Sequence, residues 1–164
     1  CWGSQAEYIR SGLDLNQWQR NFEKLLALKW VRLQINHAVN VLSIKYMDQL
    51  VDKINEWNSI RKIYTQYMTV MAPQYMNPDI FGGDLFHEDF KNIIDKLPNG
   101  TDFDNNIREY FIGISKQIGY SKPNIRQIKN LKIFLEEIDR RRNTDYKVHF
   151  PWLVDEFAKY ENNA

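Results

Sequence analysis

The chain has little cysteine, no long apolar run and no strong charge of one sign. Cys1 is the only cysteine of 164 residues, so the chain can form no internal disulfide and cannot by itself hold zinc or an iron–sulfur cluster through several thiolates. No apolar segment approaches the ~20 residues that a membrane helix needs, and no basic stretch leads into an apolar run as in a signal peptide. These absences predict a cytoplasmic protein without a membrane span.

The balance of charge excludes another broad class. The 22 basic and 21 acidic residues leave a formal charge of +1, which provides no overall field to attract nucleic acid or an anionic membrane. The sequence also has no Gly-rich phosphate loop, no GxSxG elbow, no HExxH and no Cys-x-x-Cys. Neither nucleic acid nor a membrane is therefore an expected partner.

The first residue has two interpretations. A lipid-anchored protein would begin with cysteine, but "CWGSQAEYIR" does not resemble the flexible polar tether that follows such an anchor. We therefore prefer a chain that begins in mid-sequence. With 43% hydrophobic and 26% charged residues, it has enough apolar material for one core.

The first part of the chain alternates between helical and strand periods. A helix is predicted over 13–30 with Asp14 as its N-cap, and a second over 45–58. Apolar and polar residues alternate over 31–41, and 61–72 is rich in β-branched and aromatic residues, so both are predicted strands. Helices and strands that alternate over short connections are typical of parallel βα units.

The strand predicted over 31–41 has two chemically different faces. Gln34, Asn36 and Asn40 alternate with apolar residues and should point together toward a polar interior or a ligand. His37 falls on the apolar face, where a buried, hydrogen-bonded imidazole is favoured over a metal ligand because no second ligand stands at a useful spacing. The polar face is the first candidate for a binding surface.

The second part of the chain is predicted to be all helical. A segment rich in Pro and Gly precedes the apolar stripes of three helices, which end near Leu97, Ile118 and Ile138. The fold class is thus helix-rich α/β: two parallel strands of a partial βα barrel in residues 1–72, and a helical C-terminal region packed on it in 73–164. Because parallel sheets usually have several strands and helices on both faces, we expect further strands upstream or in a partner.

One acidic cluster has a plain structural interpretation. His87 and Glu88 stand beside Asp84 and Asp89 where a helix is expected to begin. Acidic side chains at a helix N-terminus oppose the helix dipole favourably. This capping role is favoured over a metal site.

Arg140, Arg141 and Arg142 stand in the last turn of the final predicted helix, where cations stabilise free carbonyls. Three successive residues cannot share one face of a helix. We therefore expect the run to tie this helix to the barrel through carboxylates such as Asp139 or Asp145, with a phosphate site as the minority alternative. The following Phe-Pro-Trp is expected to end the helix and anchor the exit of the chain.

Three segments resemble the later portion of radical SAM proteins of the twitch-domain type. They are "AEYIRSGLDLNQWQRNFEKLL" at 6–26, "INHAVNVLSI" at 35–44 and "FLEEIDRRRNTDYKVHFPWL" at 134–153. In that family, similar segments follow a barrel strand, form the next strand and its turn, and lie near the C-terminus. The resemblance covers most of residues 6–153 and is weakest over 73–120.

The resemblance implies a [4Fe–4S] cluster on a CxxxCxxC segment, with S-adenosylmethionine bound to the fourth iron. This chain lacks that segment and the family's glycine-rich "GGE". The implied protein is a C-terminal fragment that binds neither cofactor and catalyses nothing by itself, and its partner is the missing N-terminal region of the same protein. Asn40 and Ser43 match the strand and turn that approach S-adenosylmethionine in the family.

Gln34 and Asn36 join this set of candidate cofactor-binding residues because they share the face of Asn40. For each residue of the set, hydrogen bonding to nearby backbone is an equally good interpretation.

Three functions follow from these patterns. The first is the radical SAM fragment, acting in the full-length protein on an unknown substrate. The alternative is a small helical protein-interaction module, whose core and partner surface would use the aromatic residues, 14% of the chain. A phosphate or nucleic-acid binder built on the arginine run ranks last, because it needs a one-sided basic patch.

Overall fold

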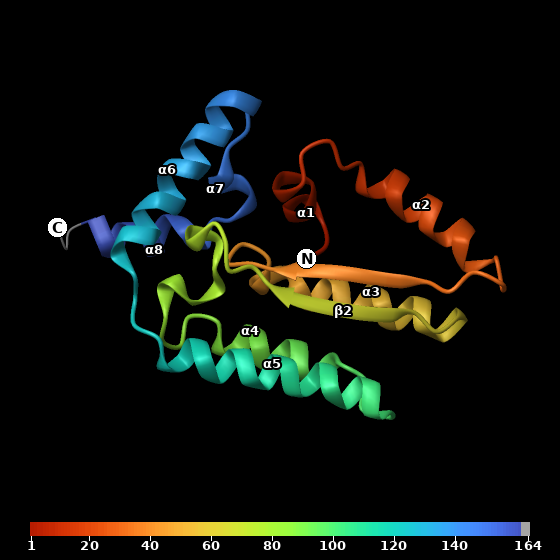
Figure 1. Cartoon of the computed structure of the whole chain (residues 1–164). Helices are drawn as coiled ribbons and strands as arrows, with labels where there is room; N and C mark the ends of the chain where they lie inside the picture. Colours follow the sequence, from red (N-terminus) through yellow and green to blue (C-terminus); the bar gives the residue numbers. More distant parts are fainter. Residues whose placement is uncertain (162–164) are drawn as a thin grey trace.

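The computed structural model describes residues 1–161 of the chain, and the predicted helix-rich α/β fold class is confirmed. Figure 1 shows the helices and the one sheet. None of the helices in this part is long and apolar enough to cross a membrane. The order of elements is α1 (Ser4–Ile9), α2 (Leu15–Leu26), β1 (Gln34–Val39), η1 (Ile44–Tyr46), α3 (Met47–Ile60), β2 (Tyr64–Thr69), η2 (Gln74–Met76), η3 (Pro78–Phe81), α4 (His87–Lys96), α5 (Asp102–Tyr120), α6 (Ile125–Arg142), α7 (Tyr146–His149) and α8 (Trp152–Glu161).

The two predicted strands are present, parallel and adjacent. Gln34 pairs with Tyr64, and the register continues to the end of both strands. Helix α3 makes the crossover between them. Each strand is shorter than its apolar pattern because the main chain leaves the sheet early: the N–H of Val41 donates to the carbonyl of Met76 (3.0 Å) and not to the neighbouring strand.

Helices cover one face of the sheet. Helices α2 and α3 lie together on that face, where Phe22 packs against Trp57 with ring centroids 4.6 Å apart and Ile35 of β1 packs against the same group. In Figure 1, α3 lies behind the strands and no helix lies in front of them. The residues on the open face are exposed and include Gln34, Asn36, Ala38, Gln66 and Met68.

The larger hydrophobic core joins both halves of the chain. It contains Tyr8 of α1, Val39 of β1, Phe90 of α4, Phe111 of α5 and Phe157 of α8, all buried. The sheet and the C-terminal helices are therefore packed into a shared core, and the boundary predicted between residues 72 and 73 stays a prediction.

Polar side chains cap several helices. Asp14 accepts from the N–H of Gln17 (2.8 Å), so the predicted cap of α2 is confirmed. Thr101 caps α5 by accepting from the N–H of Asp104 (3.2 Å). Asn124 caps α6 by accepting from the N–H of Gln127 (3.2 Å). An N-cap oxygen satisfies an N–H that has no partner within its own helix.

The Phe-Pro-Trp segment at 150–152 does not end the helix that carries the arginines, because α6 already ends at Arg142. Helix α7 precedes this segment and α8 follows it. Pro151 stands directly before α8, a place where proline is tolerated because the first N–H groups of a helix have no intrahelical partner. Phe150 is fully buried, as expected for an anchor.

The arginine run does not form the expected carboxylate ties to the barrel. Arg140 and Arg141 both donate to Glu137 of the same helix, at 2.8 and 2.6 Å, and are largely exposed. Their hydrogen bonds lower the pKa of Glu137 to about 2. Arg142 reaches out of the helix, but to a main-chain carbonyl, that of Tyr8 (3.1 Å). The carboxylate that joins α6 to α1 is Asp139, which accepts from the phenol of Tyr8.

Candidate functional site

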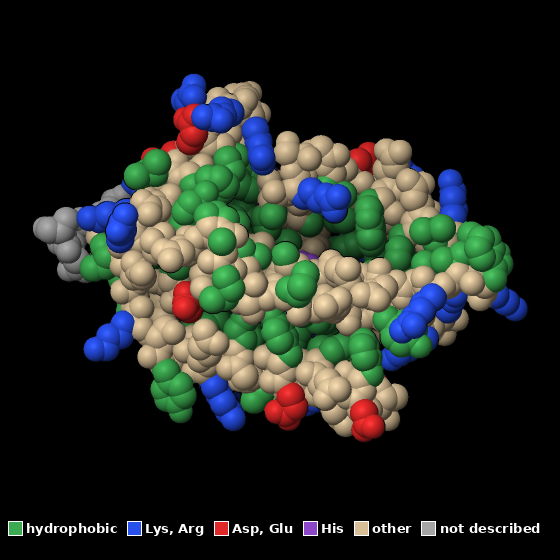
Figure 2. All heavy atoms as spheres, in the orientation of Figure 1, with side chains coloured by type: hydrophobic (Ala, Val, Ile, Leu, Met, Phe, Trp, Pro, Cys, Tyr) green, Lys and Arg blue, Asp and Glu red, His purple; other side chains and the backbone are tan. Residues whose placement is uncertain are grey.

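A cleft of about 300 Å³ lies along β1. Its walls are formed by β1 and by the N-terminal residues up to the first turns of α2. Figure 2 shows the hollow between the N-terminal helices and the strand, with apolar side chains on its walls. The N-terminal side contributes Trp2, Ala6, Ile9, Leu13, Leu15 and Trp18. We treat this cleft, together with the open face of the sheet beside it, as the candidate functional site.

The cleft lies against the free edge of β1. The described sheet has two strands, so each has one unpaired edge. The carbonyl of Leu33 accepts from the N–H of Tyr64 (3.0 Å), and that of Val39 accepts in the same way at the far end (2.9 Å). In a parallel ladder, alternate residues direct both main-chain groups to the same side. The N–H and C=O groups of Asn36 and Ala38 therefore point away from β2, toward the cleft that these residues line.

Three of the four candidate residues from the sequence meet at this cleft. Asn36, Asn40 and Ser43 line it. Gln34 does not; its side chain lies on the open face and donates to Asn36 Oδ1 (2.7 Å) and to Gln66 Oε1 (3.3 Å). The open face thus carries a short row of amide groups beside the cleft.

Asn40 and Ser43 are buried and hold the turn that follows β1. Asn40 Oδ1 accepts from the N–H groups of Leu42 (3.0 Å) and Ser43 (3.1 Å). The Ser43 hydroxyl accepts from the N–H of Asn40 (3.0 Å) and donates to its carbonyl (2.9 Å). These bonds match the local backbone role given as the alternative to cofactor binding. Nδ2 of Asn40, which lies 3.5 Å from the carbonyl of Ala38, is the amide group left with a weak bond.

His37 lies on the covered face of β1 and borders the cleft. Its Nε2 lies 3.2 Å from the amino nitrogen of Cys1, and its ring packs edge-on to Tyr67 at 6.0 Å. Burial, and to a smaller extent the charge of the Cys1 amino group, lower the pKa of His37 to about 3. The imidazole is therefore neutral at physiological pH and has the hydrogen-bonded, packed character that the sequence predicted.

The sequence did not indicate the apolar wall of the cleft. Trp18 falls within the helix predicted over 13–30, but its place beside β1 depends on how α2 packs. Trp2 packs against Trp18 and Trp57 with ring centroids 5.9 and 5.5 Å apart. No local pattern in the sequence signals this contact of Trp2. The residue precedes α1, and α1 itself has six residues, too few to show a helical period.

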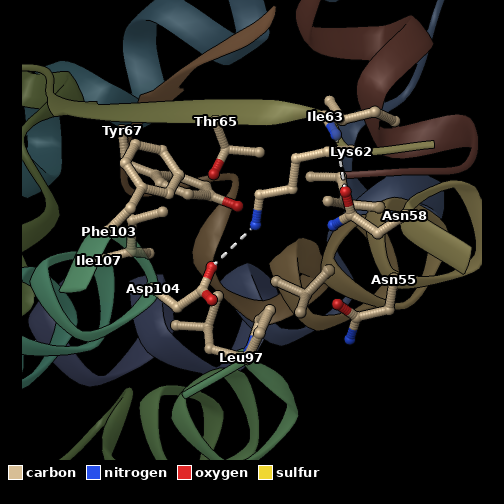
Figure 3. A pocket seen from close by; sticks show the side chains of 13 residues that line it. Asn55, Asn58, Lys62, Ile63, Thr65, Tyr67, Leu97, Phe103, Asp104 and Ile107 are labelled. Atoms are coloured by element: carbon tan, nitrogen blue, oxygen red, sulfur yellow. Dashed lines mark hydrogen bonds and ion pairs between the residues drawn. The ribbon is translucent and has the colours of Figure 1, made fainter. Parts of the chain in front are cut away.

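A second, smaller pocket lies on the covered face of the sheet, between β2, α3 and α5 (Figure 3). Its volume is about 20 Å³, which is room for about one water molecule. Lys62 and Asp104 face each other across it, with Nζ and Oδ1 3.2 Å apart. This pocket is a packing feature around an ion pair and is too small for an organic ligand.

The described residues contain no group of three or more His, Cys, Asp or Glu side chains that could hold a metal ion. His87, Glu88 and Asp89 form the first turn of α4, where the capping interpretation placed them. Asp89 also accepts from Lys45 Nζ (3.0 Å), so this acid binds η1 to α4.

Comparison of the chain with protein-family models, with curated proteins and with solved structures finds no match. The functional argument therefore depends on the geometry of the site.

Proposed function

We propose that this chain is the C-terminal part of a radical SAM enzyme, in which its sheet forms part of the wall of a ligand cavity. The open face of the sheet is the observation that carries the proposal. Gln34, Asn36 and Gln66 form a row of amides on the face that no helix covers. A βα barrel places its helices outside the sheet and turns the other face inward, which is the arrangement of α2, α3 and the two strands.

The position of the turn after β1 supports the same proposal. Ligands of parallel βα folds bind at the carboxyl ends of the strands. Asn40 and Ser43 follow the carboxyl end of β1, and Asn36 lies three residues before it. Amide groups both donate and accept hydrogen bonds, so Asn36 and the weakly bonded Nδ2 of Asn40 suit the amino, carboxylate and hydroxyl groups of S-adenosylmethionine.

The iron–sulfur cluster does not fit this chain alone. A [4Fe–4S] cluster of this kind needs three thiolates, and Cys1 is the only cysteine. The proposal therefore assigns the cluster to polypeptide upstream of Cys1. The residues of this chain would shape the cavity and bind the polar groups of S-adenosylmethionine or substrate.

The coding sequence upstream of the Cys1 codon tests this proposal first. A continuous reading frame that encodes CxxxCxxC is the expected result, and a start codon at Cys1 would overturn the proposal. With the longer protein in hand and its cluster reconstituted, Asn36→Ala should weaken S-adenosylmethionine binding at least tenfold, because one hydrogen-bonding side chain contributes about that factor. Asn105→Ala, at an exposed position on α5, is the matched control.

The interaction module remains a second candidate because of one surface feature. Trp30 is 84% exposed and Ile60 is 68% exposed. Arg61 at the end of α3 donates to the carbonyls of Leu28 and Lys29, which brings the two apolar side chains to the same end of the molecule. Exposed apolar groups of this size mark partner surfaces in some proteins. Trp30→Ser would abolish capture of a partner while leaving folding unchanged, which circular dichroism would verify.

A further inference from the structure

The free edge of β1 has the chemistry of a binding site for another strand. Asn36 and Ala38 each direct one N–H and one C=O group away from β2, and both residues line the cleft. The N–H and C=O groups at these alternating positions are best matched by an extended polypeptide, because its main chain offers donors and acceptors at the same spacing. Adjacent strands lie ~4.8 Å apart, so the occupant must enter the cleft itself.

The walls of the cleft suit the side chains of such a strand. Alternate side chains of a strand point to opposite faces of its sheet. On the covered face they would meet Leu13, Leu15 and Trp18, which are apolar. On the open face they would extend the row of Gln34 and Gln66. The expected occupant therefore alternates apolar and polar residues, as β1 does.

The course of the chain fixes the direction of this strand. In Figure 1 the N-terminus lies near the carboxyl end of β1, and α2 runs back toward the beginning of β1. Helix α2 packs beside the crossover helix α3 on the same face of the sheet. A strand that leads into Cys1 and is followed by α2 would thus form a second crossover of the same kind, and such units join parallel strands.

The position of Cys1 identifies the segment. Cys1 lines the cleft, and its nitrogen lies 3.2 Å from Nε2 of His37 in the middle of β1. Any residue joined to that nitrogen begins within the cleft. We propose that the segment directly preceding Cys1 in the polypeptide occupies the cleft as a β-strand parallel to β1, hydrogen-bonded to the main chain of Asn36 and Ala38. This inference rests on the proposed function in requiring upstream residues, but it needs no cluster.

The experiment compares amide hydrogen exchange in two proteins: the present chain, and the same chain extended by the ten residues encoded before Cys1. In the extended protein, exchange of the Asn36 and Ala38 amides should slow by roughly 100-fold or more, since each would gain a partner in a sheet. The His37 amide, which points to β2, should be protected in both proteins and is the internal reference. Unchanged exchange at Asn36 and Ala38 would overturn the inference, as would a start codon at Cys1.

A proline variant distinguishes protection caused by an added strand from protection caused by a general loss of flexibility in the extended protein. Ala38→Pro removes the outward N–H, and proline is tolerated on an edge strand when its N–H faces away from the neighbour. In the extended protein this change should return Asn36 to the exchange rate of the unextended chain, whereas Ala38→Ser should not. Equal protection in both variants would overturn the inference. Circular dichroism of each variant in the unextended chain checks that β1 still forms.

The two proposals can fail separately. Protection without an upstream CxxxCxxC would keep the strand and remove the radical SAM function. A CxxxCxxC segment without protection of Asn36 and Ala38 would keep the function and remove the strand from this cleft.

Discussion

The phenol of Tyr8 donates a 2.8 Å hydrogen bond to the carboxylate of Asp139, a residue 131 positions further along the chain. The same carboxylate accepts from the hydroxyl of Thr144 (2.6 Å) and from the N–H of Tyr146 (2.7 Å). Asp139 therefore joins the short helix α1 to the end of α6 and the start of α7. Because α1 forms one wall of the cleft, its position depends on this C-terminal carboxylate.

Loss of the hydrogen bond between Tyr8 and Asp139 should destabilise the fold. We expect Tyr8→Phe to lower the free energy of unfolding by ~1 kcal/mol, and Asp139→Ala by ~2–3 kcal/mol because three donors lose their acceptor. Urea denaturation measures both. Tyr120→Phe is the control, since Tyr120 is 88% exposed. Equal stability of Asp139→Ala and the unaltered chain would show that α1 is held in another way.

The three arginines of α6 should differ in their importance. Arg142→Ala should lower the free energy of unfolding by ~1 kcal/mol, because the carbonyl of Tyr8 loses a charged donor. Arg140→Ala and Arg141→Ala should leave stability unchanged within experimental error, since both side chains are about 70% exposed and bind Glu137 on their own helix. If all three variants, and the triple variant, unfold like the unaltered chain, the hydrogen bond from Arg142 to the carbonyl of Tyr8 does not stabilise the fold.

The neutral imidazole of His37 predicts a pH dependence of stability. The pKa of His37 is about 3 in the folded chain and 6.5 ordinarily, so between these values the unfolded chain binds a proton that the folded chain does not. The contribution of His37 to stability should therefore be complete above pH 6.5 and be lost as the pH falls toward 3. Burial also lowers the pKa of the Cys1 amino group from 8.0 to about 5, which adds a loss of the same sign between pH 8 and pH 5. The His37→Gln variant should lose part of this slope in denaturation curves measured from pH 7 to pH 4.

The exposed His87 at the start of α4 provides the control for that measurement. His87→Gln should keep the slope of the unaltered chain. A His37→Gln variant whose slope also stays the same would show that other groups cause the pH dependence.

The two residues of the ion pair in Figure 3, Lys62 and Asp104, should contribute unequally to the stability of the fold. The side chain of Asp104 is 7% exposed and that of Lys62 is 46% exposed. Burial raises the pKa of Asp104, but hydrogen bonds from Thr101 and Lys62 outweigh burial and lower it overall. We expect Asp104→Ala to cost ~2 kcal/mol, because it removes the buried acceptor of hydrogen bonds from Thr101 Oγ1 (2.7 Å) and Lys62 Nζ (3.2 Å). Lys62→Met should cost less than ~1 kcal/mol, and a larger loss for Lys62→Met would contradict this order.

The sequence predicted much of the sheet and little of the cleft. Period-two alternation placed Gln34 and Asn36 together on the polar face, and Asp14 marked the start of α2. The alternation identifies the face of a strand but not its edges, which depend on neighbours far away in the chain. Gln34 and Asn36 were therefore grouped as equals, although Asn36 alone reaches the cleft at the edge.

The short helices were missed for a related reason. Helix α1 has six residues and α7 has four, too few for a helical period to appear. Each is stabilised by distant partners, as the bond from Tyr8 to Asp139 shows. Tertiary packing, which local propensity does not encode, decides such segments.

The long separation between Tyr8 and Asp139 also has a consequence during synthesis. Helix α1 emerges from the ribosome first, and the carboxylate of Asp139, which holds Tyr8 in place, is synthesised 131 residues later. The domain is synthesised over seconds at ~5–20 residues per second, and for most of that time α1 has no anchor. The part of the cleft wall formed by α1 is thus fixed last, after β1 and β2 are both available to pair. A preceding strand could join their sheet before the cleft closes, so its entry would need no later opening of the finished fold.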